Sequence, residues 1–334
     1  MSTEFILPLL DRASRVRAGF VDARHETAFR LFNGFTEGCP DLSIEIFATT
    51  GVFYNYAAIP ADGAALVEEA LKFVRARFPW LQAGIVKIRN SSTQEERRGK
   101  KLFGARLDQK IREKDIWYAI DLTMNQDSSL YLDTRNLRAW AAHSLENKTV
   151  LNTFGYTGSL GVAALAGGAK QVFQLDRNPA FLAVAKRSYA LNSLAIDESN
   201  FLAADFWSEI SRLKKSGRRF DCIFVDPPFF AVSSRGVVDQ VQHAVRLINK
   251  VRPLVNDAGF LIVINNALFV SGSDFFATLQ GLCRDSYLKI LELIPVPEDI
   301  TGTAETRINP PITDPSPFNH ATKIAILGVQ RKRT

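Results

Sequence analysis

The residues with the most evident chemistry follow an apolar run in the C-terminal half of the chain. Residues 220–225 have the length and composition of a buried strand, and Asp-Pro-Pro-Phe-Phe follows at 226–230. Because proline cannot continue a central strand, the chain must leave the sheet there. A carboxylate, carbonyl oxygens and aromatic faces then meet at a strand's carboxyl end, where open parallel sheets bind ligands. This suits a grip on a flat base, and the alternative is an ordinary proline turn with both phenylalanines in the core. The candidate catalytic residues here are Asp226, Pro227, Phe229 and Phe230.

A second group of residues precedes this corner and has the pattern of a nucleoside site. Residues 148–154 predict a strand, followed by a glycine turn and a helix that ends near residue 167. The next predicted strand ends in Asp176, about 20 residues after the turn, where a carboxylate can reach a ribose diol. Asn152 and Thr153 occupy the early positions of the glycine fingerprint of dinucleotide enzymes, which disfavours a nicotinamide cofactor.

A third predicted strand, 199–204, ends in Asp205 and Phe206, an acid and a ring that suit the edge and face of adenine. Each acid at a strand end has an ordinary alternative explanation as a helix N-cap. In succession, however, Asp176, Asp205 and Asp226 resemble the acids of class I S-adenosylmethionine (SAM) methyltransferases. That resemblance implies an α/β fold with a Rossmann-like sheet of seven strands.

Composition narrows the alternatives. The 334 residues are 46% hydrophobic and 23% charged, as in soluble globular proteins, and the length allows about two domains. The net charge of +6 fits an RNA partner without requiring one. Cys39, Cys222 and Cys283 are widely separated, which predicts free thiols in a reducing cytoplasm, and the four scattered histidines disfavour a zinc site. No apolar run approaches the ~20 residues that cross a bilayer.

The order of predicted elements divides the chain into three parts. Residues 1–33 are expected to form a basic helical segment. Residues 34–130 alternate at strand period around an amphipathic helix, which predicts a small α+β domain and a role in RNA binding. Its charged stretch at 95–101 is a mobile loop that contacts phosphate or is simply solvated. Residues 131–334 alternate strands and helices, and a proline-rich loop at 297–320 is expected near the mouth of the active site.

The end of the chain completes the predicted sheet. A helix over about 237–251 is expected after the Asp-Pro-Pro corner, then a fifth strand at 259–266 and a helix at 274–282. Two consecutive strands, 288–296 and 323–329, come last. A late pair of consecutive strands is the order expected of class I methyltransferases.

From about residue 31 onward, the chain resembles bacterial large-subunit (23S) ribosomal RNA methyltransferases in which a small α+β domain precedes the SAM domain. The resemblance implies a cytoplasmic SAM-dependent enzyme that acts on ribosomal RNA and does not associate with membranes. The motifs that carry it are Asn-Gly-Phe-Thr-Glu-Gly-Cys-Pro-Asp-Leu at 33–42, Leu-Tyr-Leu-Asp-Thr-Arg at 130–135, Leu-Asn-Thr-Phe-Gly-Tyr-Thr-Gly at 151–158 and Asp-Pro-Pro-Phe-Phe at 226–230.

Three departures from the family pattern bear on the reaction. Members that methylate cytosine C5 carry an N-terminal PUA domain, which is expected to be missing because only about 30 residues precede the match. Those members also use a cysteine just after the fifth strand, where this chain has Asn265 and Asn266, and neither Cys222 nor Cys283 replaces it. The two asparagines resemble members that methylate guanine at N7. Phe229 resembles N6-adenine and N4-cytosine enzymes instead.

The resemblance also implies which residues surround the cofactor. Asp176 is expected to bind the ribose, and the turn after the first strand to surround the methionine moiety. Arg135 faces the cofactor carboxylate or the RNA, or forms a salt bridge to a helix acid, and Asn265 bonds the target base or simply ends its strand. The full set is Tyr131, Arg135, Asn152, Phe154, Tyr156, Thr157, Gly158, Asp176, Arg177, Asp205, Phe206 and Asp226.

The predicted reaction is methyl transfer to a base nitrogen of ribosomal RNA, at guanine N7 or an exocyclic amine, without a covalent cysteine adduct. An amine needs hydrogen bonds from its N–H groups to Asp226 and the Pro227 carbonyl, whereas the N7 lone pair needs no base. The alternatives are a protein or small-molecule N-methyltransferase on the same fold, and an RNA-binding scaffold without catalysis.

Overall fold

The computed structural model describes residues 4–233, 236–239 and 244–331. They fall into two compact units. Unit 1 comprises Met1–Leu132 and Pro297–Pro311, and unit 2 comprises Asp133–Val296 and Ile312–Thr334. The late segment Pro297–Pro311 therefore completes the N-terminal unit, and the chain passes between the units at three points.

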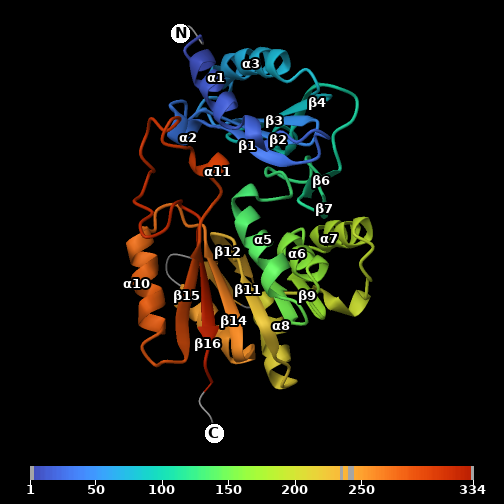
Figure 1. Cartoon of the computed structure of the whole chain (residues 1–334), viewed down its shortest axis with the longest axis vertical. Helices are drawn as coiled ribbons and strands as arrows, with labels where there is room; N and C mark the ends of the chain where they lie inside the picture. Colours follow the sequence, from blue (N-terminus) through green and yellow to red (C-terminus); the bar gives the residue numbers. More distant parts are fainter. Residues whose placement is uncertain (1–3, 234–235, 240–243, 332–334) are drawn as a thin grey trace. The chain divides into compact units, whose positions relative to one another are not determined.

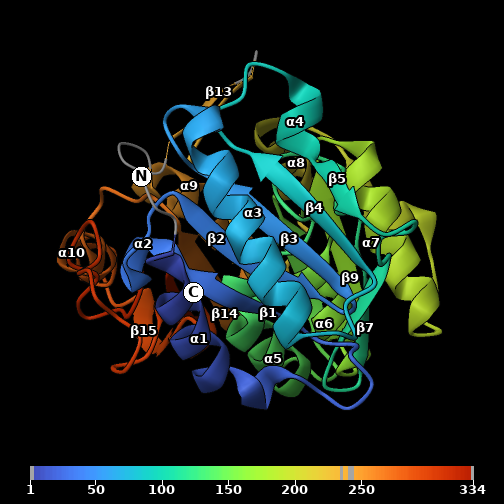
Figure 2. The same ribbon diagram turned by 90° about the horizontal axis from the view of Figure 1, so that it is seen from above.

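Unit 1 is built on a five-stranded sheet in the order β1-β2-β3-β4-β5. Neighbouring strands are antiparallel except β3 and β4, which are parallel because a long helix connects them. Figure 2 shows α1 and α3 lying across the sheet. The strands are β1 (Ala28–Asn33), β2 (Leu42–Phe47), β3 (Thr50–Asn55), β4 (Ala83–Ile88) and β5 (Lys100–Phe103), with a separate hairpin of β6 (Lys110–Glu113) and β7 (Ile116–Ala119). The helices are α1 (Ile6–Val16), η1 (Ala18–Phe20), α2 (Gly34–Glu37), α3 (Pro60–Arg77), α4 (Gln94–Arg98) and α11 (Glu298–Thr301).

Buried polar groups attach the segment 297–311 to the rest of unit 1. The Arg17 side chain is 1% exposed, and its guanidinium donates to the Glu37 carboxylate at 2.7 Å and to the Asp299 backbone carbonyl at 2.9 Å. Asn33 donates from its side-chain amide to the Ile300 carbonyl at 2.7 Å. Because a buried donor left without its acceptor costs about 1–3 kcal/mol, and more when it is charged, these carbonyls make the segment an integral part of the unit.

Unit 2 is a seven-stranded sheet in the order β10-β9-β8-β11-β14-β16-β15. All neighbours are parallel except β16, which is antiparallel to both of its neighbours. This is the predicted class I methyltransferase sheet, with the late pair of strands at one edge. The strands are β8 (Thr149–Thr153), β9 (Gln171–Asp176), β10 (Phe201–Ala203), β11 (Phe220–Val225), β14 (Val255–Asn265), β15 (Leu288–Ile294) and β16 (Lys323–Val329).

Helices cover both faces of this sheet. In Figure 1, α5, α6 and α7 lie on one side of the strands and α10 lies on the other. Two apolar clusters fill these interfaces, one around α5 and α6 and the other around α8, α9 and α10. The helices are η2 (Leu132–Thr134), α5 (Arg135–Ser144), α6 (Ser159–Ala166), α7 (Pro179–Leu191), η3 (Glu198–Asn200), α8 (Phe206–Lys215), α9 (Ala244–Val251), η4 (Arg252–Leu254) and α10 (Gly272–Leu282).

Two predictions for the N-terminal part were wrong. The helical segment predicted over 1–33 ends at Val16, and Ala28–Asn33 form β1, where Arg30 pairs across the strands with Glu45 at 2.6 Å. The mobile loop predicted at 95–101 is the short helix α4 followed by β5. The hydroxyl of Thr93 caps that helix by accepting from the Glu96 N–H.

Two predictions for the C-terminal part were also wrong. Of the helix predicted over 237–251, the described residues Ala244–Val251 are helical, whereas residues 236–239 form β13 (Gly236–Asp239), which pairs with β12 (Phe230–Ser233) in a hairpin. This hairpin follows the proline corner directly. Its residues form strands because they include β-branched and aromatic types, which favour strands. The loop expected at 297–320 contains α11, and its first part belongs to unit 1 while its last part belongs to unit 2.

Candidate active site

The carboxyl ends of the parallel strands bring the predicted acids to one edge of the unit 2 sheet. Thr153 at the end of β8 lies level with Leu175 of β9 and with Val225 of β11. Asp176 and Asp226 each follow by one residue, so they flank the end of the central strand β8. Two interstrand spacings separate them, which is about 10 Å.

A left-handed turn connects β8 to α6. Phe154, Tyr156 and Gly158 have positive φ values of 54°, 48° and 78°. Gly158 must be glycine, because a Cβ there would lie 2.5 Å from the Cβ of Ala185. The Tyr156 ring packs edge-on against Phe181 at 4.6 Å. Thr157 is buried within the same turn.

Two buried amides hold this turn in place. Asn152 donates to the side-chain oxygen of Gln174 at 2.8 Å, and Gln174 donates in turn to the Gly158 carbonyl at 3.1 Å. Asn152 is 2% exposed, so its position is that of a brace behind the turn. Gln174 was not predicted as a site residue. Its signal in the sequence is an amide in the middle of an otherwise apolar strand.

Asp176 receives two backbone hydrogen bonds, one on each carboxylate oxygen. Oδ2 accepts from the Tyr156 N–H and Oδ1 from the Asn178 N–H, both at 2.8 Å. Burial raises the pKa of Asp176 above its ordinary value. A carboxylate oxygen accepts more than one hydrogen bond, so the half-buried group retains acceptor capacity for a diol.

Asp205 and Phe206 have structural roles at the end of β10. Asp205 caps α8, since its carboxylate accepts from the Ser208 N–H at 3.2 Å. Phe206 is 5% exposed and stacks on Phe154 with ring centroids 4.5 Å apart. Its packing is therefore that of a core residue, in contrast to the exposed ring expected for an adenine face.

Asp226 differs from the other acids, because none of the described residues donates a hydrogen bond to its carboxylate. Burial and the neighbouring carboxylate of Asp133 raise the pKa of Asp226 to about 7. Asp133 is held by the hydroxyl of Thr322, which donates to its Oδ2 at 2.7 Å. Its Oδ1 is buried and has no partner in the described part of the chain. The pair thus has unused capacity to bind a donor or take up a proton.

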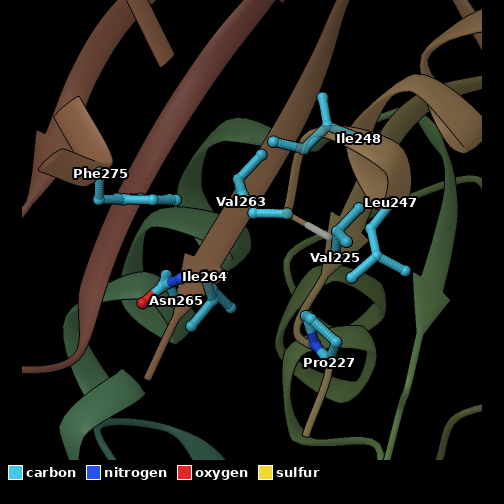
Figure 3. A pocket seen from close by; sticks show the side chains of 9 residues that line it. Val225, Pro227, Leu247, Ile248, Val263, Ile264, Asn265 and Phe275 are labelled. Carbon is cyan, nitrogen blue, oxygen red and sulfur yellow. The ribbon is translucent and has the colours of Figure 1, made fainter. Parts of the chain in front are cut away.

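A small cavity of about 10 Å³ lies behind the proline corner, between β11 and β14. Figure 3 shows Pro227 on one side of it and Asn265 on the other. Asn265 is 2% exposed, and its side-chain oxygen accepts from the Ala267 N–H at 3.1 Å. The cavity has room for about one water molecule, so a base would have to bind at the outer surface of the corner.

The remaining predicted residues lie in several places. Phe229 is 48% exposed and so is not part of the core, whereas the side chain of Phe230 lies outside the described residues. Arg177 is exposed directly after Asp176, and Arg135 is the first residue of α5. Tyr131 belongs to unit 1, where its hydroxyl donates to Asp127 at 3.0 Å.

Lys323 is a further buried polar residue that the sequence analysis missed. It pairs in register with Asn265, and its ammonium donates to the backbone carbonyls of Ala267 and Ala321. Burial lowers the pKa of Lys323 to about 8. Asp133 was also missed, although it stands within the quoted motif at 130–135. Its signal is an acid that directly follows the buried Leu132 and lies just before a helix. None of the helices in the described part of the chain is long and apolar enough to span a bilayer.

Comparisons with known proteins agree with this geometry. YwbD of Bacillus subtilis, provisionally assigned to ribosomal RNA large-subunit methylation, is 27% identical over 88% of this chain and 75% of its own length. "Ribosomal RNA large subunit methyltransferase I" of Aeromonas hydrophila is 29% identical over 69% of this chain. The chain matches only 58% of that relative's length and 64% of its Escherichia coli counterpart.

The fold also matches a solved structure. SMU.776, solved in complex with SAH, superimposes with a TM-score of 0.84 over 98% of this chain and 82% of that chain, at 23% identity. The model of the S-adenosylmethionine-dependent methyltransferase family matches residues 87–303. This range includes the acids at the strand ends and the proline corner. The chain therefore belongs to the S-adenosylmethionine-dependent methyltransferase family.

Proposed function

We propose that this protein methylates a base nitrogen of ribosomal RNA, with an exocyclic amine as the acceptor favoured over guanine N7. The observation that carries the proposal is the Asp226 carboxylate, which is half-buried and without a hydrogen bond from the described residues, and which the exposed Phe229 follows by three positions. We choose ribosomal RNA as the substrate because the relatives in Aeromonas and Escherichia coli are named for it. The net charge of +6 is consistent with an RNA substrate.

The residues at the sheet edge fit the family's cofactor. Asp176 would hold the ribose diol, because its carboxylate is fixed by two N–H donors and still has lone pairs available. The backbone of the braced turn from Phe154 to Gly158 would line the methionine moiety. When bound, SAM supplies a methyl group activated by its sulfonium. The protein's task is then largely to position the acceptor.

In this proposal, Asp226 orients the acceptor amine and takes up its proton. The amine N–H groups would donate to the Asp226 carboxylate and to the Pro227 carbonyl, which directs the nitrogen lone pair toward the methyl carbon. Methylation of the amine would leave its nitrogen with one proton to lose. An Asp226 with a pKa of about 7 can accept this proton near neutral pH. Guanine N7 loses no proton on methylation and needs no such group.

The surroundings of the cysteines support a mechanism without a covalent adduct. Cys222 is fully buried in β11, and burial raises the pKa of its thiol well above the ordinary value. Cys39 is buried in unit 1, and Cys283 follows α10. A catalytic cysteine needs an accessible thiolate, which a raised pKa disfavours. At the end of β14, where the sequence analysis looked for a catalytic cysteine, the chain has Asn265.

Mass spectrometry of ribosomal RNA nucleosides, from cells with and without the gene, tests this function. We expect one methylated nucleoside to disappear with the gene, either N6-methyladenosine, N4-methylcytidine or N2-methylguanosine. Purified protein with labelled SAM should restore it on the deficient RNA. Loss of 7-methylguanosine would exclude the amine assignment. Transfer to a peptide or metabolite, with every RNA ignored, would exclude the RNA substrate.

A further inference from the structure

The chain leaves β14 through a tight turn that has two apolar residues at its tip. Leu268 is 39% exposed and Phe269 is 73% exposed. The Val270 N–H closes the turn by donating to the Ala267 carbonyl at 3.3 Å. Turn tips usually hold glycine, asparagine, aspartate or serine, because these residues suit the backbone and prefer water. An exposed phenylalanine at this position therefore points to a contact with a partner molecule.

The two ends of this turn are fixed. Ala267 is fully buried, its N–H bonds the side-chain oxygen of Asn265, and its carbonyl accepts from the Lys323 ammonium at 3.0 Å. Val270 packs against the main apolar cluster of unit 2. Because both ends are anchored, the turn holds Phe269 in a defined place at low entropic cost to binding.

A second exposed ring leaves the neighbouring strand. β11 and β14 are parallel neighbours with Val225 opposite Val263, and Pro227 and Asn265 beyond them line the same cavity. Phe229 follows Pro227 by two residues and is 48% exposed. Two exposed phenylalanines thus stand on the segments that leave two adjacent strands of the sheet.

We infer that Phe229 and Phe269 form an aromatic clamp that receives an unstacked base of the RNA. This inference rests on the proposed function and adds a residue of the substrate site. A base in single-stranded or flipped form has two apolar faces for the rings and a polar edge for Asp226. An apolar protein surface fits less well, because it would bury the Asp226 carboxylate without giving it a donor.

Binding of single-stranded and duplex RNA to Phe269→Ala tests the clamp. The probes are a fluorescein-labelled 12-nucleotide RNA and the same RNA annealed to its complement, with anisotropy as the readout. Because stacking contributes about 1–3 kcal/mol per base, we expect roughly tenfold weaker binding of the single strand. Duplex binding should change less than about twofold, since its bases are already stacked. Phe269→Trp should restore single-strand affinity.

Ile196→Ala is the matched control, because Ile196 is 43% exposed on a loop away from the strand ends. It should bind both probes like the wild type, and all variants should bind SAM in calorimetry with unchanged affinity. Equal affinity of Phe269→Ala and wild type for the single strand would overturn the clamp, as would an equal loss for both probes. A shift of Phe269→Ala from dimer to monomer with RNA affinity intact would assign the turn to self-association instead. If the wild type neither binds nor methylates RNA, the proposed function itself fails.

Discussion

The ends of β8 and β11 lie side by side in one sheet, yet they are built in opposite ways. At β8, Asn152 and Gln174 bond one another and the turn carbonyl. At β11, Asp226 receives no hydrogen bond from the described residues, and Phe229 is exposed. The first region uses its polar groups to fix a backbone shape, whereas the second leaves them available. In a fold shared by many enzymes, unused hydrogen-bonding capacity distinguishes the reacting groups from the scaffold.

The largest expected effect is a difference in unfolding free energy between the alanine variants of two phenylalanines. Phe206→Ala removes a buried ring stacked on Phe154 and should lower the free energy of unfolding by about 3–5 kcal/mol. Phe229→Ala removes an exposed ring and should change it by less than about 0.5 kcal/mol. Urea denaturation measures both. Similar losses for the two variants would mean that Phe229 is part of the core and would remove the contrast between the strand ends.

Asp226→Asn should lower methyl transfer by roughly 100-fold or more, because the amide cannot take up a proton. The stability of the variant should instead rise above that of the wild type at high pH. The folded pKa of about 7 lies above the ordinary value of 3.8, so stability is lost as pH rises between these values and the carboxylate ionises. At pH 8 the variant should therefore unfold less readily than the wild type, by on the order of 4 kcal/mol, with no difference at pH 3. A variant that is less stable at both pH values would refute this account of Asp226.

Asn152→Ala should lower the free energy of unfolding by about 1–3 kcal/mol, because it leaves the Gln174 oxygen buried without a donor. The cofactor affinity should fall with it, since the turn loses its brace. The control is Gln171→Ala, at the start of β9, the strand that also holds Gln174. Gln171 bonds the side chain of Asn200, and this variant should lose less than about 1 kcal/mol of unfolding free energy. A loss of SAM affinity with unchanged stability would make Asn152 a direct ligand instead.

The smallest expected effect is a shift in the pH dependence of the methyl-transfer rate. Transfer should rise with pH and reach half its maximum near pH 7, where Asp226 ionises. Asp133→Asn keeps an acceptor for the Thr322 hydroxyl but removes the neighbouring charge, so the midpoint should move down by about one pH unit. Rate profiles of both enzymes under saturating SAM measure it. A profile without a midpoint would favour guanine N7 as the acceptor.

The sequence predicted the unit 2 sheet because its strands are apolar runs between glycine and proline signals, and three of them lead into an acid. It could not distinguish a structural role from a cofactor-binding role for Asp205 and Phe206, since a capping acid and a core ring have the same sequence pattern as a ligand pair. Phe269 was missed for a related reason. Whether an apolar residue is buried depends on contacts that are distant in the chain, and 24 phenylalanines made this one inconspicuous.

The N-terminal part was harder to predict because its contacts are less local. Arg30 was taken as part of a basic helix, but it bonds Glu45 on the neighbouring strand. Arg17 lies in the same predicted basic segment, but it is buried against Glu37 and Asp299. The sequence separation of Arg17 and Asp299, 282 positions, is beyond the reach of any local pattern.

That separation has a consequence for synthesis of the protein on the ribosome. Arg17 and Glu37 emerge early, but the carbonyl of Asp299 that completes their network is translated only near the end. Until then, unit 1 lacks α11 and keeps a charged pair without its full set of partners. Its final, stable form therefore has to wait for nearly the whole chain, even though its sheet is encoded first.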